Sequence, residues 1–125
     1  RFAIANPEHA PYGQGAIQAL RSQGLEPDAK PKLVLGDNVS QAATFIDSGA
    51  AQAGLIAHSL VLSPALAGKG AWTLIPQAWH APLEQALVMT RRAADNPLAA
   101  AFLKHLDAPA RRTLLQRHGF GLAAN

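Results

Sequence analysis

Short apolar runs alternate along this chain with segments of helical periodicity, and short loops join them. Runs of strand type occupy residues 2–5, 33–35, 54–57, 72–75 and 83–90, and helical patterns occupy residues 13–23, 39–46, 58–67, 96–106 and 109–118. Strands that alternate with helices pair in parallel, because each helix carries the chain back across the sheet. The alternation therefore predicts an α/β fold, with a mostly parallel sheet flanked by helices.

Proline, glycine and asparagine residues predict where the helices begin and end. Pro7 and Pro11 exclude a helix from residues 6–12, because proline lacks the amide proton that a helix interior needs. Glycine tolerates the left-handed conformation that ends many helices. The glycines expected in this role are Gly24, Gly49 and Gly119. Asn38 or Asp37 is the expected N-cap of the helix that follows the second strand.

The first helix is preceded by a segment that resembles a dinucleotide-binding fingerprint. Gly13 and Gly15 follow an apolar run and precede a helical pattern, and Asp37 comes after the second strand. The third glycine position of that fingerprint holds Gln18, and seven residues separate the run from Gly13. Close packing of helix on strand needs glycine or alanine at that third position. A nucleotide site, and with it a dinucleotide-dependent enzyme, is therefore a minor alternative.

A more general expectation concerns the starts of the first two long helices. Both begin beyond the carboxyl end of a predicted strand, which is the edge where ligands bind in open α/β sheets. A helix start offers unpaired amides and a partial positive charge, so it can bind an anion without a cationic side chain. The candidate amides are those of Tyr12 and Gly13 at one helix, and of Val39 and Ser40 at the other.

The sequence lacks the common enzymatic and metal-binding motifs that would argue against an anion-binding site. The sequence has no cysteine, G-x-S-x-G elbow, Walker A loop or H-E-x-x-H motif, and its five histidines lack metal-ligand spacing. We therefore expect no enzyme activity, no metal site and no cofactor. No apolar stretch approaches the roughly 18 residues that a membrane span requires. The chain begins at Arg1 without a signal sequence, so we expect a fragment or a trimmed form of a longer protein.

The basic residues are concentrated near the C-terminus. Six of the 11 lysines and arginines lie from Arg91 onward, against two acidic residues there. The pattern of residues 109–118 carries three arginines but no aromatic residue that could stack on a base. Its Leu114 and Leu115 compete for a buried face. A solvated helix face is the favoured interpretation, and nucleic acid is not an expected partner.

Three segments resemble the periplasmic molybdate-binding proteins of ABC importers. They read AIANPEHAPYGQGAIQAL, KLVLGDNVSQAATFIDSGAAQAGLIA and NPLAAAFLKHLDAPARRTLLQRHGF. The resemblance runs through nearly the whole chain in order, but covers only the second half of such a protein. It implies one lobe of a type II periplasmic solute-binding protein that binds molybdate or tungstate for an ABC permease. The ligand-binding lobe would comprise residues 1–88, and residues 89–125 would be helices that pack on the absent first lobe.

The resemblance also assigns roles to particular residues. The backbone amides of Tyr12 and Val39 would donate to the oxyanion, with Gly13 and Ser40 as secondary donors. Some members use a tyrosine hydroxyl just after the third strand, where this chain has Ala57. The N-terminal lobe would supply the remaining ligands. Without it, the exposed apolar surface makes a homodimer of the fragment plausible. The alternative function is the effector-sensing lobe of a transcription regulator with the same fold.

Overall fold

The computed structural model describes residues 1–121. The chain divides into two compact units, Arg1–Leu83 and Glu84–Asn125. The division falls a few residues before the expected boundary at residue 88, and the last residues of the expected segment 89–125 lie outside the described part.

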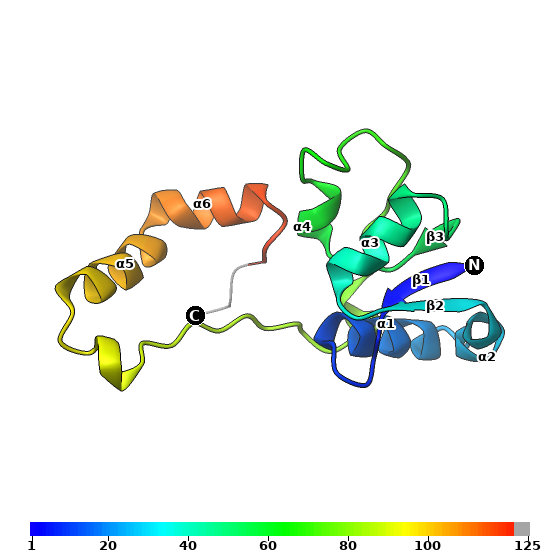
Figure 1. Cartoon of the computed structure of the whole chain (residues 1–125), viewed down its shortest axis with the longest axis horizontal. Helices are drawn as coiled ribbons and strands as arrows, with labels where there is room; N and C mark the ends of the chain where they lie inside the picture. The colour runs from blue at the N-terminus through cyan, green and yellow to red at the C-terminus, as the bar shows by residue number, and fades with distance from the viewer. Residues whose placement is uncertain (122–125) are drawn as a thin grey trace. The chain divides into compact units, whose positions relative to one another are not determined.

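The first unit is built on a three-stranded parallel sheet with strand order β2-β1-β3 (Figure 1). β1 (Phe2–Ala5) lies in the middle, between β2 (Leu33–Gly36) and β3 (Ala53–Gly54). β1 pairs with β2 along its whole length, from Phe2 opposite Leu33 to Ala5 opposite Gly36. The α/β class with a parallel sheet is therefore confirmed.

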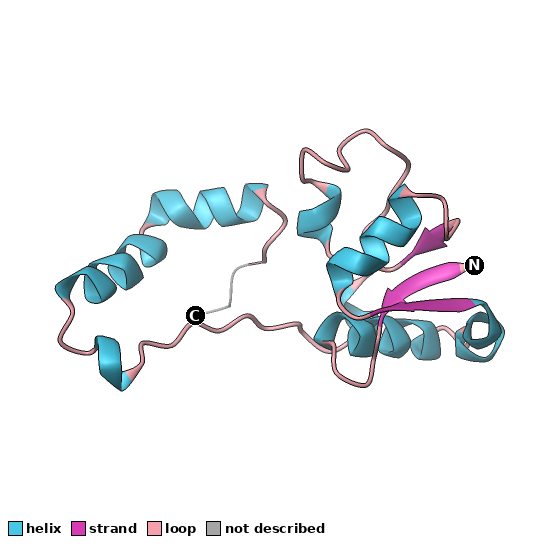
Figure 2. Ribbon diagram, viewed as in Figure 1, coloured by secondary structure: helices cyan, strands magenta, loops and turns pink. Residues whose placement is uncertain are grey.

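Two helices cover the opposite faces of this sheet (Figure 2). These are α1 (Pro11–Ser22) and α3 (Val39–Asp47). Ala3 packs in one buried cluster with Ala42 of α3. Ile4, which alternates with Ala3 along the strand, faces the side of α1 and is fully buried. Most of the buried core residues are alanines, so the helices lie close to the sheet.

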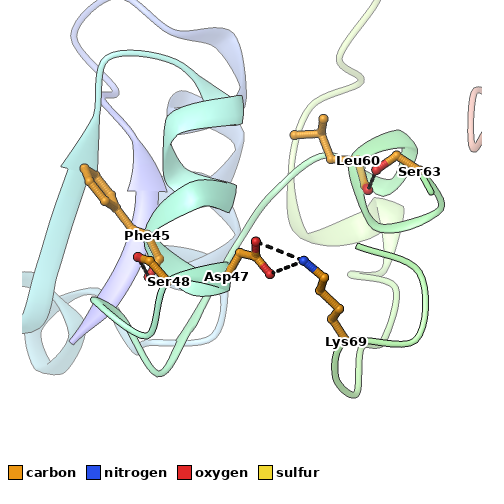
Figure 3. Close-up of polar contacts among 6 residues, drawn as sticks. All are labelled: Phe45, Asp47, Ser48, Leu60, Ser63 and Lys69. Atoms are coloured by element: carbon orange, nitrogen blue, oxygen red, sulfur yellow. Dashed lines mark hydrogen bonds and ion pairs between the residues drawn. The ribbon is translucent and has the colours of Figure 1, made fainter. Parts of the chain in front are cut away.

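Shorter elements complete the first unit. α2 (Glu26–Ala29) and a 3-10 helix (Lys30–Lys32) connect α1 to β2, and α4 (His58–Val61) follows β3. A second 3-10 helix spans Gln77–Trp79. Beyond α4, Lys69 Nζ contacts the two carboxylate oxygens of Asp47 at 3.0 and 3.2 Å, and so ties this loop to the end of α3 (Figure 3).

Glycines allow two helices to approach the strand ends closely. A Cβ at Gly13 would fall on the Ala5 carbonyl oxygen and lie 2.8 Å from the Ala5 carbonyl carbon. A Cβ at Gly36 would lie 2.7 Å from the amide nitrogen of Ala42 in α3. Real Cβ atoms do not occur at such distances from backbone, so both positions require glycine. Gly13 therefore serves the packing of α1 against β1, rather than a nucleotide.

The expected helix ends at glycines are confirmed. Gly24, Gly49 and Gly119 have φ values of 70°, 77° and 84°, in the left-handed region. The expectation for Pro11 was wrong: it is the first residue of α1 rather than part of a helix-free loop. The first helical position makes no use of the amide proton that proline lacks, so proline is well suited there.

Two expected strands are absent from the described residues. Segments 72–75 and 83–90 have no strand structure, and Trp72 and Leu74 are 52% and 59% exposed. A strand requires a hydrogen-bonded neighbour, and neither segment has one within residues 1–121. The helix expected over 58–67 is the shorter α4, and the strand expected over 54–57 is the shorter β3. Both expectations overestimated how much of the apolar sequence is regular.

The second unit contains two helices. α5 (Pro97–Asp107) begins at Asn96, whose side chain accepts a hydrogen bond from the Leu98 amide, and α6 (Pro109–Arg117) follows it. A 3-10 helix, Arg91–Ala93, precedes them. Neither α-helix has a buried residue. The expectation of a buried face on α6 was wrong, since Leu114 is 44% exposed.

Within residues 1–121, no helix combines the length and the apolar character needed to cross a membrane.

A pair of glycine substitutions in α1 tests the close approach of α1 to β1. Gly13→Ala should lower the free energy of unfolding by about 1–3 kcal/mol, because the new methyl group meets backbone that cannot move aside. Gly15→Ala is the matched control, since its Cβ would lie 3.3 Å from the flexible side chain of Leu83. It should cost clearly less than Gly13→Ala, because the end of a leucine side chain can shift by a few tenths of an ångström and alanine favours a helix by up to about 1 kcal/mol over glycine. Urea unfolding followed by circular dichroism measures both. Equal effects would contradict the proposed contact.

Candidate anion-binding site

The sheet topology brings the starts of α1 and α3 to the same edge. β1 and β2 are parallel neighbours, and each is followed by one of these helices. The amide of Asn6 donates to the Gly36 carbonyl at 2.7 Å, which extends the pairing one step beyond the strands. Both helix N-termini therefore lie at the carboxyl edge of the sheet, as the sequence predicted.

The start of α1 leaves one candidate amide free and uses the other. Ala10 is the N-cap and supplies no side-chain acceptor. Its carbonyl accepts the amide of Gly13 at 2.9 Å and that of Gln14 at 3.1 Å. The amide of Tyr12 donates no hydrogen bond within residues 1–121. The amide of Tyr12 is therefore an available donor, whereas that of Gly13 is already engaged.

The start of α3 leaves two candidate amides free. Asn38 is the N-cap, and its Oδ1 accepts the Gln41 amide at 3.0 Å. Asparagine is therefore the cap, rather than Asp37. The amides of Val39 and Ser40 donate to no acceptor in the described part of the chain. Unpaired amides at a helix start are partially positive, and they favour a bound anion.

Asn6 organises the loop that leads from β1 into α1. Its Oδ1 accepts the Glu8 amide at 3.0 Å, and its carbonyl accepts the amides of His9 at 3.4 Å and Ala10 at 2.9 Å. Together with the bond to Gly36, these contacts set the direction in which the chain enters α1. Sequence reasoning gave Asn6 no role. The signal that could have revealed it is the asparagine directly after a strand, a residue type that bonds its own backbone in turns.

His9 connects this loop to the loop before α3. Its Nε2 lies 3.0 Å from the main-chain oxygen of Asp37. A carbonyl oxygen only accepts hydrogen bonds, so His9 carries a proton on Nε2 and donates it. The two helix starts are therefore joined by a side chain as well as by the sheet. Sequence reasoning missed this contact, because no local pattern relates residues 28 positions apart.

A separate groove lies beside the edge strand β2, with a cavity volume of about 550 Å³. Leu33 and Leu35 of β2 line it, together with the ion pair between Arg21 and Glu26. The hydrogen bond from the exposed Arg21 lowers the pKa of the half-buried Glu26 carboxyl, and the same bond raises the pKa of Arg21. The charges of this pair satisfy each other, and neither Tyr12 nor Val39 lines the groove. It is therefore distinct from the two helix starts.

The region after β3 contributes no tyrosine hydroxyl. Ala57 is buried there as the N-cap of α4, and His58 opens that helix as expected. The ring of His58 packs against Trp72, with centroids 5.0 Å apart. Its Nε2 is buried and has no hydrogen-bond partner in the described part of the chain.

Comparison with known proteins shows which family this chain belongs to. The model of the bacterial extracellular solute-binding proteins matches residues 1–121. The chain belongs to that family. Its members bind solutes, so the family is one of binding and transport proteins rather than enzymes.

Individual relatives carry a more specific name. The chain is 36% identical over 122 residues to the molybdate-binding protein ModA of Azotobacter vinelandii, and 34% identical over 118 residues to that of Rhodobacter capsulatus. These matches include 97% and 94% of this chain but 48% and 46% of the relatives. A solved periplasmic molybdate-binding protein of A. vinelandii superposes with a TM-score of 0.85 at 28% identity, over 99% of this chain and 55% of that one. The resemblance to molybdate-binding proteins is therefore confirmed, and this solute-binding chain spans about half their length.

Proposed function

We propose that this chain is one lobe of a periplasmic protein that binds molybdate or tungstate for an ABC importer. The observation that carries the proposal is a pair of unpaired helix-start amides, Tyr12 and Val39, at one sheet edge. The similarity to proteins named for molybdate binding supports this ligand class. Ser40 is a further donor in the proposal, since its amide is also free. Gly13 is left out, because its amide is already bonded to Ala10.

The donors of this site suit a fully deprotonated tetrahedral dianion. Molybdate and tungstate carry no proton at neutral pH, so amides alone can satisfy their oxygens. Hydrogen phosphate would direct its own proton at a donor, and such an unpaired contact costs about 1–3 kcal/mol. Sulfate carries no proton either, so the pocket must exclude it by size. Neutral amides also allow release to a permease, because no ion pair with lysine or arginine has to break.

The proposal requires a second lobe. A tetrahedral anion bridged between two lobes is buried when a hinge closes, and the closed form would dock on the permease. The second unit supplies apolar surface for such a lobe, since Val88, Leu98 and Phe102 are 81%, 77% and 55% exposed. We propose that this surface packs on the missing lobe. In the isolated chain a second copy could cover it instead.

Two substitutions at Val39 separate the role of its amide from that of its side chain. Val39→Pro removes the amide proton, and the fold should tolerate it: position 39 is the first of the helix, and Asn38 before it is extended, with φ −148° and ψ 174°. Val39→Ala keeps the amide and is the matched control. Loss of one hydrogen bond to a charged ligand costs about 1.5–3 kcal/mol, so Val39→Pro should raise the Kd about ten- to a hundredfold. Isothermal titration of the complete two-lobed protein with molybdate measures this. Full affinity in Val39→Pro would exclude that amide.

Tyr12→Phe tests the other helix start. The hydroxyl of Tyr12 makes no hydrogen bond within residues 1–121, and the proposed donor is its backbone amide. The substitution should therefore leave the Kd for molybdate within about twofold in the complete protein. Abolished binding would identify the hydroxyl as the ligand and contradict the proposal.

The isolated 125-residue chain should bind molybdate weakly or not at all, because it offers only part of the donor set. Titration of the chain alone, with the complete protein as the reference, tests this. A Kd below about 1 μM for the chain alone would contradict the need for a second lobe.

A further inference from the structure

The backbone of Asp37 is held from both sides by side chains. Gln41 Oε1 accepts the Asp37 amide at 2.6 Å, and His9 Nε2 donates to the Asp37 carbonyl at 3.0 Å. The first contact is local, from the first turn of α3. The second comes from a loop that precedes a different helix, α1. Asp37 is therefore fixed both to its own helix and to the start of the other one.

We propose that His9 is a positioning residue, which sets the placement of the Val39 amide relative to the Tyr12 amide. The inference rests on the proposed function, because it concerns the same two donors. The Asp37 carbonyl belongs to the peptide unit that leads into the N-cap Asn38. Peptide units are planar, so a bond that holds this oxygen also fixes the plane through which the chain enters α3.

The exposure of His9 argues against a role in packing. His9 is exposed, and its ring belongs to no buried cluster of the described residues. Its side-chain hydrogen bond bridges 28 residues of sequence and joins the loop after β1 to the loop after β2. The bond from the Asn6 amide to Gly36 also connects these strand ends, as a continuation of the strand pairing. His9 adds a second point of attachment, beyond the strand ends where the proposed donors lie. Two bonds restrict the movement of one loop relative to the other more than a single bond does.

The placement of two donors matters for a small rigid anion. Molybdate presents oxygens at fixed tetrahedral directions, so amides on two helices satisfy it only at one separation. Preorganised donors avoid the cost of ordering on binding. A loop free to shift would retain each amide but lose the correct spacing. The expected consequence of losing His9 is thus weaker anion binding without loss of the fold.

Four variants of the complete two-lobed protein test this role. His9→Ala removes the donor. His9→Gln restores it, since the glutamine Nε2 is the same number of bonds from Cα as the histidine Nε2. His9→Asn is one bond shorter and cannot reach. Gln14→Ala is the control, because Gln14 is exposed on α1 and its side chain makes no hydrogen bond within residues 1–121.

Molybdate titration and thermal unfolding without ligand are measured for each variant. Losing one hydrogen bond predicts a Kd about three- to tenfold higher for His9→Ala and His9→Asn, with His9→Gln and Gln14→Ala close to the parent. An unchanged Kd in His9→Ala would overturn the inference, as would failure of His9→Gln to restore binding. A lower melting temperature with unchanged Kd would show a merely structural role. If the parent protein itself does not bind molybdate, the proposed function fails instead.

Discussion

The close approach of α1 to the end of β1 is the contact on which the rest of the site depends. It exists because Gly13 has no side chain to meet the Ala5 carbonyl, and Gly36 gives α3 the same access to β2. Small residues continue this arrangement inside the sheet, where alanines make up most of the core. Because α1 and α3 lie close to β1 and β2, both helices begin at the ends of these strands. Their unpaired amides therefore lie at one edge of the sheet. A bulkier core would have moved both helix starts away from it.

At that edge the proposed ligand donors are backbone amides, and side chains fix the position of the backbone. Asn6 directs the chain into α1, Asn38 caps α3, and His9 joins the two loops. Neutral amides with fixed positions discriminate anions by shape and protonation rather than by charge. In the proposed function, the same arrangement would let the two-lobed protein both hold its ligand and release it.

The exposed apolar segments fit a chain that spans about half of its relatives. Residues 72–75 have the composition of a strand but pair with no other strand within the described residues. Neither α5 nor α6 has a buried residue. Such surfaces are costly to leave in water, since each buried CH₂ group is worth about 0.8 kcal/mol. The proposed second lobe would cover them.

The sequence by itself determined the α/β class, the glycine helix ends and the candidate amides of Tyr12 and Val39, because each depends on local conformational preference or on matching motifs. It limited the cap of α3 to Asn38 or Asp37, and the structure decided for Asn38. Tertiary structure alone decided that segments 72–75 and 83–90 are not strands in this chain, since a strand requires a partner. It also decided that Gly13 packs against Ala5, that its amide is already engaged, and that His9 reaches Asp37. The bond of His9 joins residues 28 positions apart, and it forms only when neighbouring strands bring their loops to one edge. The contacts of Gly13 are closer in sequence, but they depend on how the chain turns from β1 into α1.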